Sequence, residues 1–131
     1  MKKLIIALAF ILFAGVAFGQ TLQKGSVLAL RTDAPTLNPG VTMEQYTDFM
    51  IDKFAPEMEK IFPGTKVFVL KGDRGEHKGG FAMLIFVESA EVRDKIFGAE
   101  DADIQSKLLP LMEELGKYGT VSDNYTDWVI Q

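Results

Sequence analysis

The chain has 131 residues, of which 47% are hydrophobic and 24% are charged, and its formal net charge is -4. The length fits one domain, and the apolar fraction is too high for a disordered protein. Because the sequence holds no cysteine, it excludes disulfides, thiolate zinc sites, cysteine-held iron–sulfur clusters and a thiol nucleophile. Its single histidine excludes a metal site built from several histidines of one chain.

Residues 1–19 have the pattern of a secretory signal peptide. Two lysines follow the first methionine, ten apolar residues come next, and Ala17 and Gly19 are small residues of the kind that precede a signal-peptidase cut. We therefore predict an exported protein, periplasmic or extracellular, that begins at Gln20. The alternative is a membrane anchor, but the apolar stretch 4–18 is shorter than the roughly 20 residues that span a bilayer.

Removing this leader changes the charge balance. The predicted mature chain keeps 112 of the 131 residues, and because the leader holds two lysines and no acid, the net charge changes from -4 to -6. No run of basic residues is present, so neither nucleic acid nor an anionic membrane surface is an expected partner, and no membrane attachment is expected after cleavage. An exported domain without disulfides must be stabilised by its core or by association with another chain.

The first two predicted elements are a short strand and a long amphipathic helix. Residues 26–31 are an apolar run typical of a strand, and two prolines and a glycine make 33–40 a loop. Thr42 and Gln45 have the spacing of a capping box, which predicts a helix start. The apolar residues of this helix recur every three or four positions, as on one helical face. They are Met43, Tyr46, Met50, Phe54, Met58 and Ile61.

Pro56 falls inside this helical pattern. It must either kink the helix or start a second segment at its first turn, because proline lacks the N–H that a helix interior uses. Pro63 and Gly64 are expected to end the helix.

A long β-hairpin is predicted next. Residues 65–71 and 81–88 are rich in residues that favour strands. The polar segment 72–80 between them holds four glycines and is typical of a hairpin connection.

The last third of the chain predicts two helices and a strand. Ser89 caps the first of these helices, which stops near Gly98. A second helical stripe covers Ile104–Leu115, where Pro110 is expected to break or restart the helix. Residues 125–130 are the expected final strand.

This order of elements predicts a single α+β domain over residues 20–131. Strand, helix, strand, strand, helix, strand is the split β-α-β arrangement of ferredoxin-like folds. Such a βαββαβ chain forms a four-stranded antiparallel sheet with the helices on one face.

The hairpin strands are apolar on both faces, which is unusual for a sheet covered on one side only. Within 81–87, alternate residues point to opposite faces, and both sets are hydrophobic. We therefore predict that a second copy covers the free face, giving a homodimer with a two-sheet barrel. The alternative is that the additional helix, Ile104–Leu115, folds over this face within one chain.

Two short segments carry a family resemblance. Phe54-Ala55-Pro56, followed by Ile61-Phe62-Pro63-Gly64, resembles the His-Ala-Pro element and apolar Pro-Gly turn of EthD-like proteins. These belong to the dimeric α+β barrel superfamily, which also includes antibiotic-biosynthesis monooxygenases and other small cofactor-independent monooxygenases. Phe54 stands where that family has its histidine, so an activity that depends on the histidine is not expected here.

The candidate ligand-binding residues are one arginine and four aromatic side chains. Arg31 shares a strand face with Val27 and Ala29, and could meet an anionic ligand at the mouth of the barrel or pair with Asp127. The aromatic candidates could line a pocket for a small apolar molecule, or simply pack in the core. They are Tyr46, Phe54, Tyr125 and Trp128.

His77 is the one side chain that titrates near neutral pH by default. It is a candidate acid/base group or heme ligand, or else an exposed residue of the hairpin loop. No metal site and no cofactor are expected.

We predict an exported dimeric binding or interaction module, with a cavity between the two sheets for a small apolar ligand. The alternative is a cofactor-independent monooxygenase-like enzyme that uses the same cavity. A cavity of about 300 Å³ or more, with Arg31, a tyrosine or His77 converging on it, would favour the enzyme.

Overall fold

The computed structural model of the chain describes residues 22–98 and 101–131, so the predicted leader, 1–19, lies outside the described residues. The strands are β1 (Val27–Arg31), β2 (Thr36–Leu37), β3 (Thr65–Lys71), β4 (Phe81–Val87), β5 (Gly119–Thr120) and β6 (Thr126–Val129). The helices are α2 (Met43–Phe49), the π-helical turn η1 (Met50–Phe54), α3 (Ala55–Ile61), α4 (Ala90–Phe97) and α5 (Ala102–Leu115). No helix of the described part is both long and apolar enough to cross a membrane.

The main sheet has four strands in the order β3-β4-β1-β6, and every neighbouring pair is antiparallel. The domain is therefore α+β, and its sheet is compatible with a ferredoxin-like fold, as predicted. The first and last strands of this sheet along the chain, β1 and β6, are slightly shorter than the runs 26–31 and 125–130 suggest. The small ladder between β2 and β5 was not predicted, because two-residue strands leave no periodic pattern.

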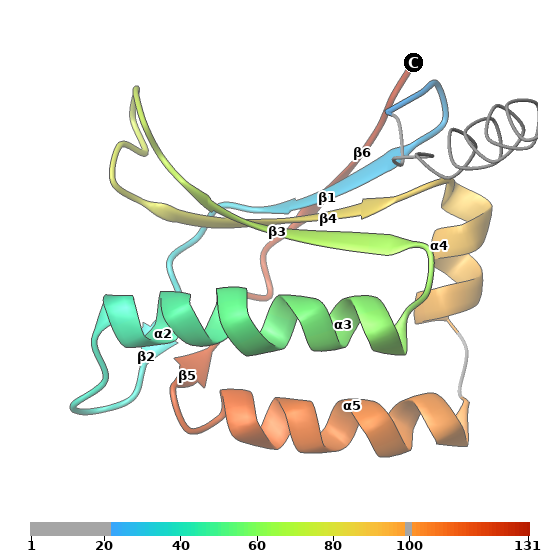
Figure 1. The fold of residues 1–131 in the computed structure, drawn as a ribbon. Helices are drawn as coiled ribbons and strands as arrows, with labels where there is room; N and C mark the ends of the chain where they lie inside the picture. Colours follow the sequence, from blue (N-terminus) through green and yellow to red (C-terminus); the bar gives the residue numbers. More distant parts are fainter. Residues whose placement is uncertain (1–21, 99–100) are drawn as a thin grey trace, which may run out of the picture.

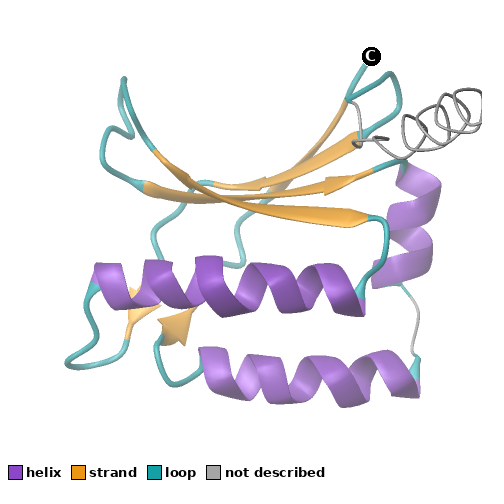
Figure 2. Cartoon of the chain, in the orientation of Figure 1, coloured by secondary structure: helices purple, strands orange, loops and turns teal. Residues whose placement is uncertain are grey.

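The helices all lie on one side of the main sheet (Figures 1 and 2). The α2-η1-α3 rod runs across that face, and α4 stands at one end of the sheet. α5 packs against α3 on the side away from the sheet. The alternative prediction, that Ile104–Leu115 covers the free face of the sheet, is therefore wrong.

Pro110 lies inside the continuous helix α5, so the expected break at this proline is wrong. The residue is exposed, and the carbonyl left without its usual helical partner belongs to Ser106, one turn earlier and also exposed. Water can satisfy that carbonyl, which lowers the cost of keeping proline in the helix.

Pro56 has a different effect in the first helical rod. The N–H of Ala55 donates to the carbonyl of Met50, five residues earlier, which closes the wider π-helical turn η1. Pro56 then lies in the first turn of α3, directly after the widened turn, which accommodates the missing N–H of the proline. Of the two predicted outcomes, a second segment beginning at the proline is the one observed. The predicted capping box is also confirmed, because Gln45 N–H donates to Thr42 Oγ1 at 3.2 Å.

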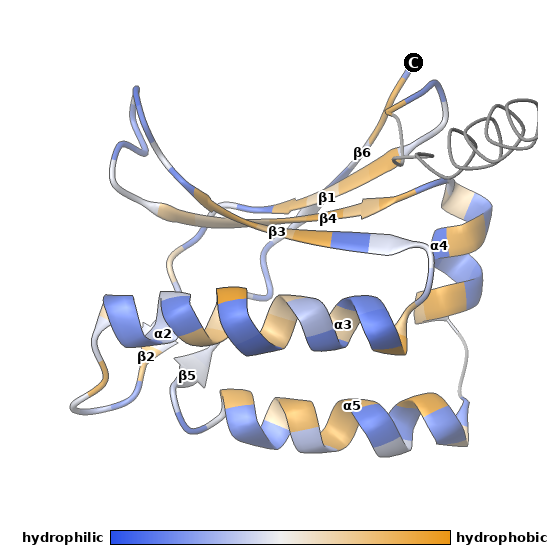
Figure 3. Ribbon diagram, in the orientation of Figure 1, coloured by the Kyte–Doolittle hydropathy of each residue, from blue (hydrophilic) through white to orange (hydrophobic). Residues whose placement is uncertain are grey.

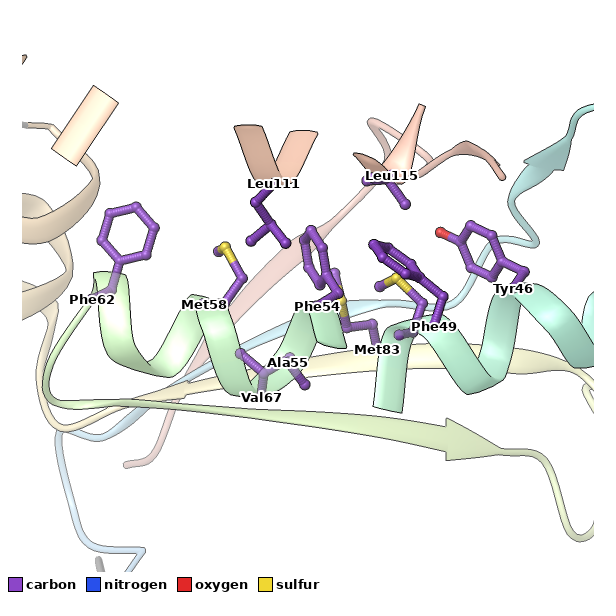
Figure 4. Packing of buried hydrophobic residues seen from close by; sticks show 11 residues of the cluster. Tyr46, Phe49, Phe54, Ala55, Met58, Phe62, Val67, Met83, Leu111 and Leu115 are labelled. Carbon is purple, nitrogen blue, oxygen red and sulfur yellow. The ribbon is translucent and has the colours of Figure 1, made fainter. Parts of the chain in front are cut away.

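The core fills two layers, one between the sheet and the helical rod and one between the rod and α5. Phe54 and Met58 point toward Leu111 of α5 in Figure 4, whereas Val67 and Met83 come from the sheet. The buried cluster is Tyr46, Phe49, Met50, Phe54, Ala55, Met58, Phe62, Val67, Met83, Leu111 and Leu115. The α2-η1-α3 rod is thus buried from both sides, and its stripe of large side chains provides most of the core.

Candidate functional site

The face of the sheet that carries no described helix is called the open face. Of its ten strand residues eight are apolar, as the pairing register and the alternation of side chains establish. They are Leu28, Leu30, Phe68, Leu70, Ala82, Leu84, Phe86 and Trp128, and the other two are Lys66 and Thr126. Figure 3 shows the hydrophobic colour along β1 and β4.

Large side chains are exposed at both edges of the open face. Phe68 on β3 is 47% exposed and Trp128 on β6 is 59% exposed, whereas Phe86 in the middle is buried. The hairpin and the end of β6 curl away from the helices, which makes this face concave in Figure 1. The open face is thus an apolar, concave surface with an exposed rim.

The opposite face, which we call the helix face, carries Arg31. Its side chain shares this face with those of Val27 and Ala29 along β1, as predicted. The guanidinium donates through Nη1 to the backbone carbonyl of Ser122, and its carbon lies 4.8 Å from the centre of the Tyr125 ring. Arg31 is half-buried and takes part in no ion pair with the residues that the structure describes.

The predicted alternative for Arg31, a pair with Asp127, is wrong. Asp127 lies opposite Ala29 rather than Arg31 in the β1–β6 register. Its Oδ2 instead accepts from Arg93 Nη1 of α4 at 2.8 Å, and Arg93 Nε also donates to Asp94 at 2.9 Å. The hydrogen bond to Asp94 and then that to Asp127 raise the pKa of Arg93, so this guanidinium is charged and already paired.

A groove of about 180 Å³ lies between α4 and the β1 side of the sheet, and we call it the Arg31 groove. Ala29 is the smallest residue on its floor, flanked by Ile85 on one strand and Asp127 on the other. The lining residues are Ala29, Arg31, Ile85, Val87, Arg93, Phe97, Tyr125 and Asp127. The groove is therefore an apolar trough with charged and aromatic residues along its ends and rim.

A second, very small cavity lies on the other side of Arg31. Tyr46 lines it together with Arg31, Asp33 and Ser122, and its volume of about 10 Å³ has room for roughly one water. The hydroxyl of Tyr46 is buried and has no hydrogen-bond partner among residues 22–98 and 101–131. Burial also raises the pKa of Tyr46 to about 12, so the phenol is neutral at physiological pH and is not poised to act as a base.

The acidic side chain near this small cavity is already engaged. Asp33 Oδ2 accepts from Asn124 Nδ2 at 2.9 Å and from the hydroxyl of Ser122 at 3.3 Å. Asp33 thus helps hold the 122–124 turn in place, and its carboxylate is a negative charge that lines the same small cavity as Arg31.

The five predicted ligand-binding residues do not converge on one cavity. Arg31 and Tyr125 line the Arg31 groove, and Tyr46 lines the small cavity beside Arg31. Phe54 is buried in the core, with its ring centre 6.5 Å from that of Phe49. Trp128 lies on the open face. Ligand binding by these residues stays a prediction, and the structure places Arg31 and Trp128 on opposite faces of the sheet.

His77 lies in the exposed loop between β3 and β4, and its carbonyl accepts from Gly80 N–H at 2.9 Å. The loop packs tightly here, because a Cβ at Gly72 would collide with this same carbonyl. His77 lines neither the Arg31 groove nor the small cavity. Within 22–98 and 101–131, no group of three or more histidine or acidic side chains is placed to hold a metal ion.

A wider depression of about 450 Å³ lies where the start of α2 meets the end of the hairpin. It includes Glu44, Asp48 and Lys71, but none of the predicted site residues. The Arg31 groove joins Arg31 and a tyrosine and is smaller than about 300 Å³, but at Arg93, Phe97 and Tyr125 it opens into a shallow depression of about 540 Å³. The condition stated above for an enzyme concerns the space between two sheets, so it stays a prediction.

Arg93 and Phe97 are groove residues that the sequence did not suggest. Arg93 is 34 positions from Asp127, and no periodicity or motif signals that a helix and a distant strand meet there. The one available signal was Ala29, a small residue in an apolar strand, which can leave a depression between larger neighbours.

Comparisons of the chain with models of protein families, with curated proteins and with solved structures found no match. The resemblance to EthD-like proteins therefore remains a prediction from the residues themselves.

Proposed function

We propose that the protein is an exported homodimeric binding module of the dimeric α+β barrel type. Two copies would join through their open faces, and the space between the two concave sheets would hold a small apolar ligand. The observation that carries this proposal is the open face itself, on which eight of ten strand residues are apolar while no described helix covers them.

The size of the open face favours a second sheet as its partner. Strands are spaced about 4.8 Å apart, so the exposed side chains of β3 and β6 are separated by about 14 Å. A single helix, about 10–12 Å across, or a small molecule would leave one edge uncovered. A second four-stranded sheet has the matching width, and twisted sheets pack face to face at about 10 Å.

The charge of the open face is compatible with self-association. Its one charged strand residue, Lys66, lies on the edge strand β3 and pairs with Glu59 of α3 at 3.2 Å. Two such faces can therefore meet without bringing unpaired like charges to the centre of the interface, which would oppose a dimer. Burying the exposed apolar side chains is worth roughly 25 cal/mol per Å² removed from water.

Analytical ultracentrifugation of the chain beginning at Gln20 tests the proposal, because this chain keeps every described helix and strand. A dimer at micromolar concentration is expected. A stable monomer at that concentration would overturn the proposal, and so would a dimer whose contacts, mapped by cross-linking, lie on α5 instead of the sheet.

Export is tested separately. Expression of the full chain in a Gram-negative host should give a periplasmic product whose first residue is Gln20. A product that retains residues 1–19 in the membrane fraction would favour the anchor instead.

A further inference from the structure

The two edges of the main sheet, β3 and β6, are protected to different degrees. On β3 the N–H of Val67 donates to Glu59 Oε1 of α3 at 2.9 Å, and the same carboxylate pairs with Lys66 at 3.2 Å. Lys66 and Lys71 are also charges of the kind that keep edge strands from pairing with other chains. The first half of the β3 edge is therefore closed by the chain itself, and both ends of the strand are charged.

The β6 edge carries no lysine, and no side chain of a described helix reaches its backbone. Ile130 N–H donates to the carbonyl of Ser26 at 3.0 Å, so alternation directs the backbone groups of the even-numbered residues toward β1. Those of Asp127 and Val129 are therefore directed outward. Among the described residues, only the Val129 carbonyl has a partner there, the side-chain amide of Gln131 at 3.2 Å.

The side chains of β6 favour pairing with another strand. Trp128 is 59% exposed and Val129 is 42% exposed, and both residue types are common in strands. Asp127 is the one charged residue of β6, and Arg93 already pairs with it at 2.8 Å. An edge with outward backbone groups, exposed apolar side chains and no unpaired charge is a template for an added strand.

We propose that β6 pairs with β6 of a second copy, antiparallel and across a two-fold axis at Trp128, so that the two main sheets join into one. In this register Asp127 of each copy lies opposite Val129 of the other, and each such pair exchanges both backbone hydrogen bonds. The partner's Asp127 N–H replaces the Gln131 side chain at the Val129 carbonyl. The two Trp128 side chains meet at a non-hydrogen-bonded position, where cross-strand aromatic pairs are closest.

The sequence of β6 is complementary to itself in this register. An axis at Asp127 would place two carboxylates directly opposite each other, which opposes pairing. An axis at Val129 would carry the overlap past the end of the strand. An axis at Trp128 avoids both and leaves each Asp127 beside its own Arg93.

The edge contact goes beyond the face-to-face dimer and does not rest on it. Asp127 and Val129 lie on the helix face by alternation with Trp128, so the hydrogen-bonded pairs lie outside the open face. Both contacts can therefore form in one assembly, and each can be removed without the other.

Sedimentation equilibrium of the Phe68→Glu chain, whose open faces are not expected to associate, tests the edge contact alone. Because β6 is four residues long, a weak dimer with a dissociation constant of roughly 100 micromolar is expected. A monomer up to about 1 millimolar would overturn the edge contact, while a dimer of the natural chain would still support the proposed function. A dimer of Phe68→Glu as tight as that of the natural chain would support the edge contact and count against the face-to-face dimer.

Charges at residue 129 test the register in the same background. Val129→Glu should weaken the edge dimer at least about tenfold relative to Val129→Lys, because residue 129 lies opposite the partner's Asp127 and the two-fold axis repeats the contact. The two variants are matched controls, since each places one long charged side chain at the same point of the helix face. Equal dissociation constants would overturn the proposed pairing.

Disulfide formation reports the contact directly, because the chain has no cysteine of its own. Trp128→Cys should form an intermolecular disulfide, since opposed non-hydrogen-bonded residues have Cα atoms about 4.5 Å apart, within the reach of a disulfide. Sheets packed face to face lie about 10 Å apart, which is too far. The control is Phe68→Cys at the opposite edge of the open face, which should oxidise far more slowly. Equal rates of oxidation in the two variants would contradict pairing through β6.

Discussion

On both faces of the main sheet, the polarity of the strand residues is the opposite of what their surroundings suggest. The helix face is covered, yet its strand residues include Arg31, Lys71 and Asp127. The open face is covered by none of the described helices, yet Lys66 is its single charged strand residue. The difference arises because the helical rod packs closely on β3, whereas α4 meets β4 and, through the Arg93–Asp127 pair, β6, and the Arg31 groove forms beside α4. A covered face can therefore hold a polar site, while an uncovered face can hold an unfinished core.

The largest effect is expected from damage to the core on the covered side of the sheet, in the layer between the helical rod and α5. Phe54→Ala should lower the free energy of unfolding by about 3–5 kcal/mol, because a buried aromatic ring leaves a cavity when it is truncated. Chemical denaturation at a fixed protein concentration measures this. Ile51→Ala, on the same π-helical turn but 50% exposed, is the control and should change stability by less than about 0.5 kcal/mol. Equal losses in both variants would mean that Phe54 is not a core residue.

A charge on the open face should change association while leaving the fold intact. Phe68→Glu should raise the dimer dissociation constant about 100-fold, which is about 2.7 kcal/mol, because a carboxylate would be buried without a partner. Sedimentation equilibrium measures the constant. The control is Ile51→Glu, because Ile51 is 50% exposed and Phe68 is 47% exposed. Ile51 lies on the helical rod and not on the open face. If both variants associate equally, the open face is not the interface.

The smallest effect expected concerns the buried hydroxyl of Tyr46. At neutral pH Tyr46→Phe should stabilise the protein by about 1 kcal/mol, because no described residue offers the buried hydroxyl a hydrogen bond. The pKa of Tyr46 is about 12 in the folded chain against 10.0 for the free side chain, so the native state favours the neutral phenol. The stabilising effect of that preference is complete below pH 10 and is lost as the pH rises toward 12.

This pH dependence can be measured directly. The advantage of Tyr46→Phe over the natural chain should grow by about 1 kcal/mol between pH 9 and pH 11, since only the natural chain loses stability when its unfolded phenol ionises. Denaturation of both chains across that range is the measurement. A difference in stability between the two chains that stays constant from pH 9 to pH 11 would contradict the raised pKa of Tyr46 in the folded chain.

Much of the main sheet and of the first helix could be predicted from the sequence, because each element carries its own local signal. Thr42 and Gln45 mark a helix start through their spacing alone, and the hairpin strands are continuous apolar runs. The effect of a proline was harder to predict. Pro56 and Pro110 look alike in sequence, but one begins a segment and the other lies on the exposed side of a continuous helix.

The candidate site could be predicted only in part, because it depends on contacts between distant segments. Alternation along β1 correctly placed Arg31 beside Ala29, and Tyr125 was also named. The pairing of Asp127 with Arg93 depends on how α4 lies against β6, which no local pattern encodes. The sequence analysis assigned all five candidate residues to a single cavity. In the structure, Trp128 and Arg31 lie on opposite faces of the sheet.

The π-helical turn at Met50–Phe54 determines how much change the first rod can tolerate. Tyr46, Met50, Phe54 and Met58 follow one another at four-residue intervals, whereas an ideal α-helix repeats every 3.6 residues, so each step would carry the stripe about 40° around the axis. The wider turn takes up part of that drift and keeps both halves of the rod in phase with the same core. Insertion of one further residue within 50–54, where the turn is already widened, would rotate α3 by about 100° relative to α2 and turn Met58 away from α5. The length of this short segment is therefore under a stricter constraint than the identity of an exposed residue within it, such as Ile51.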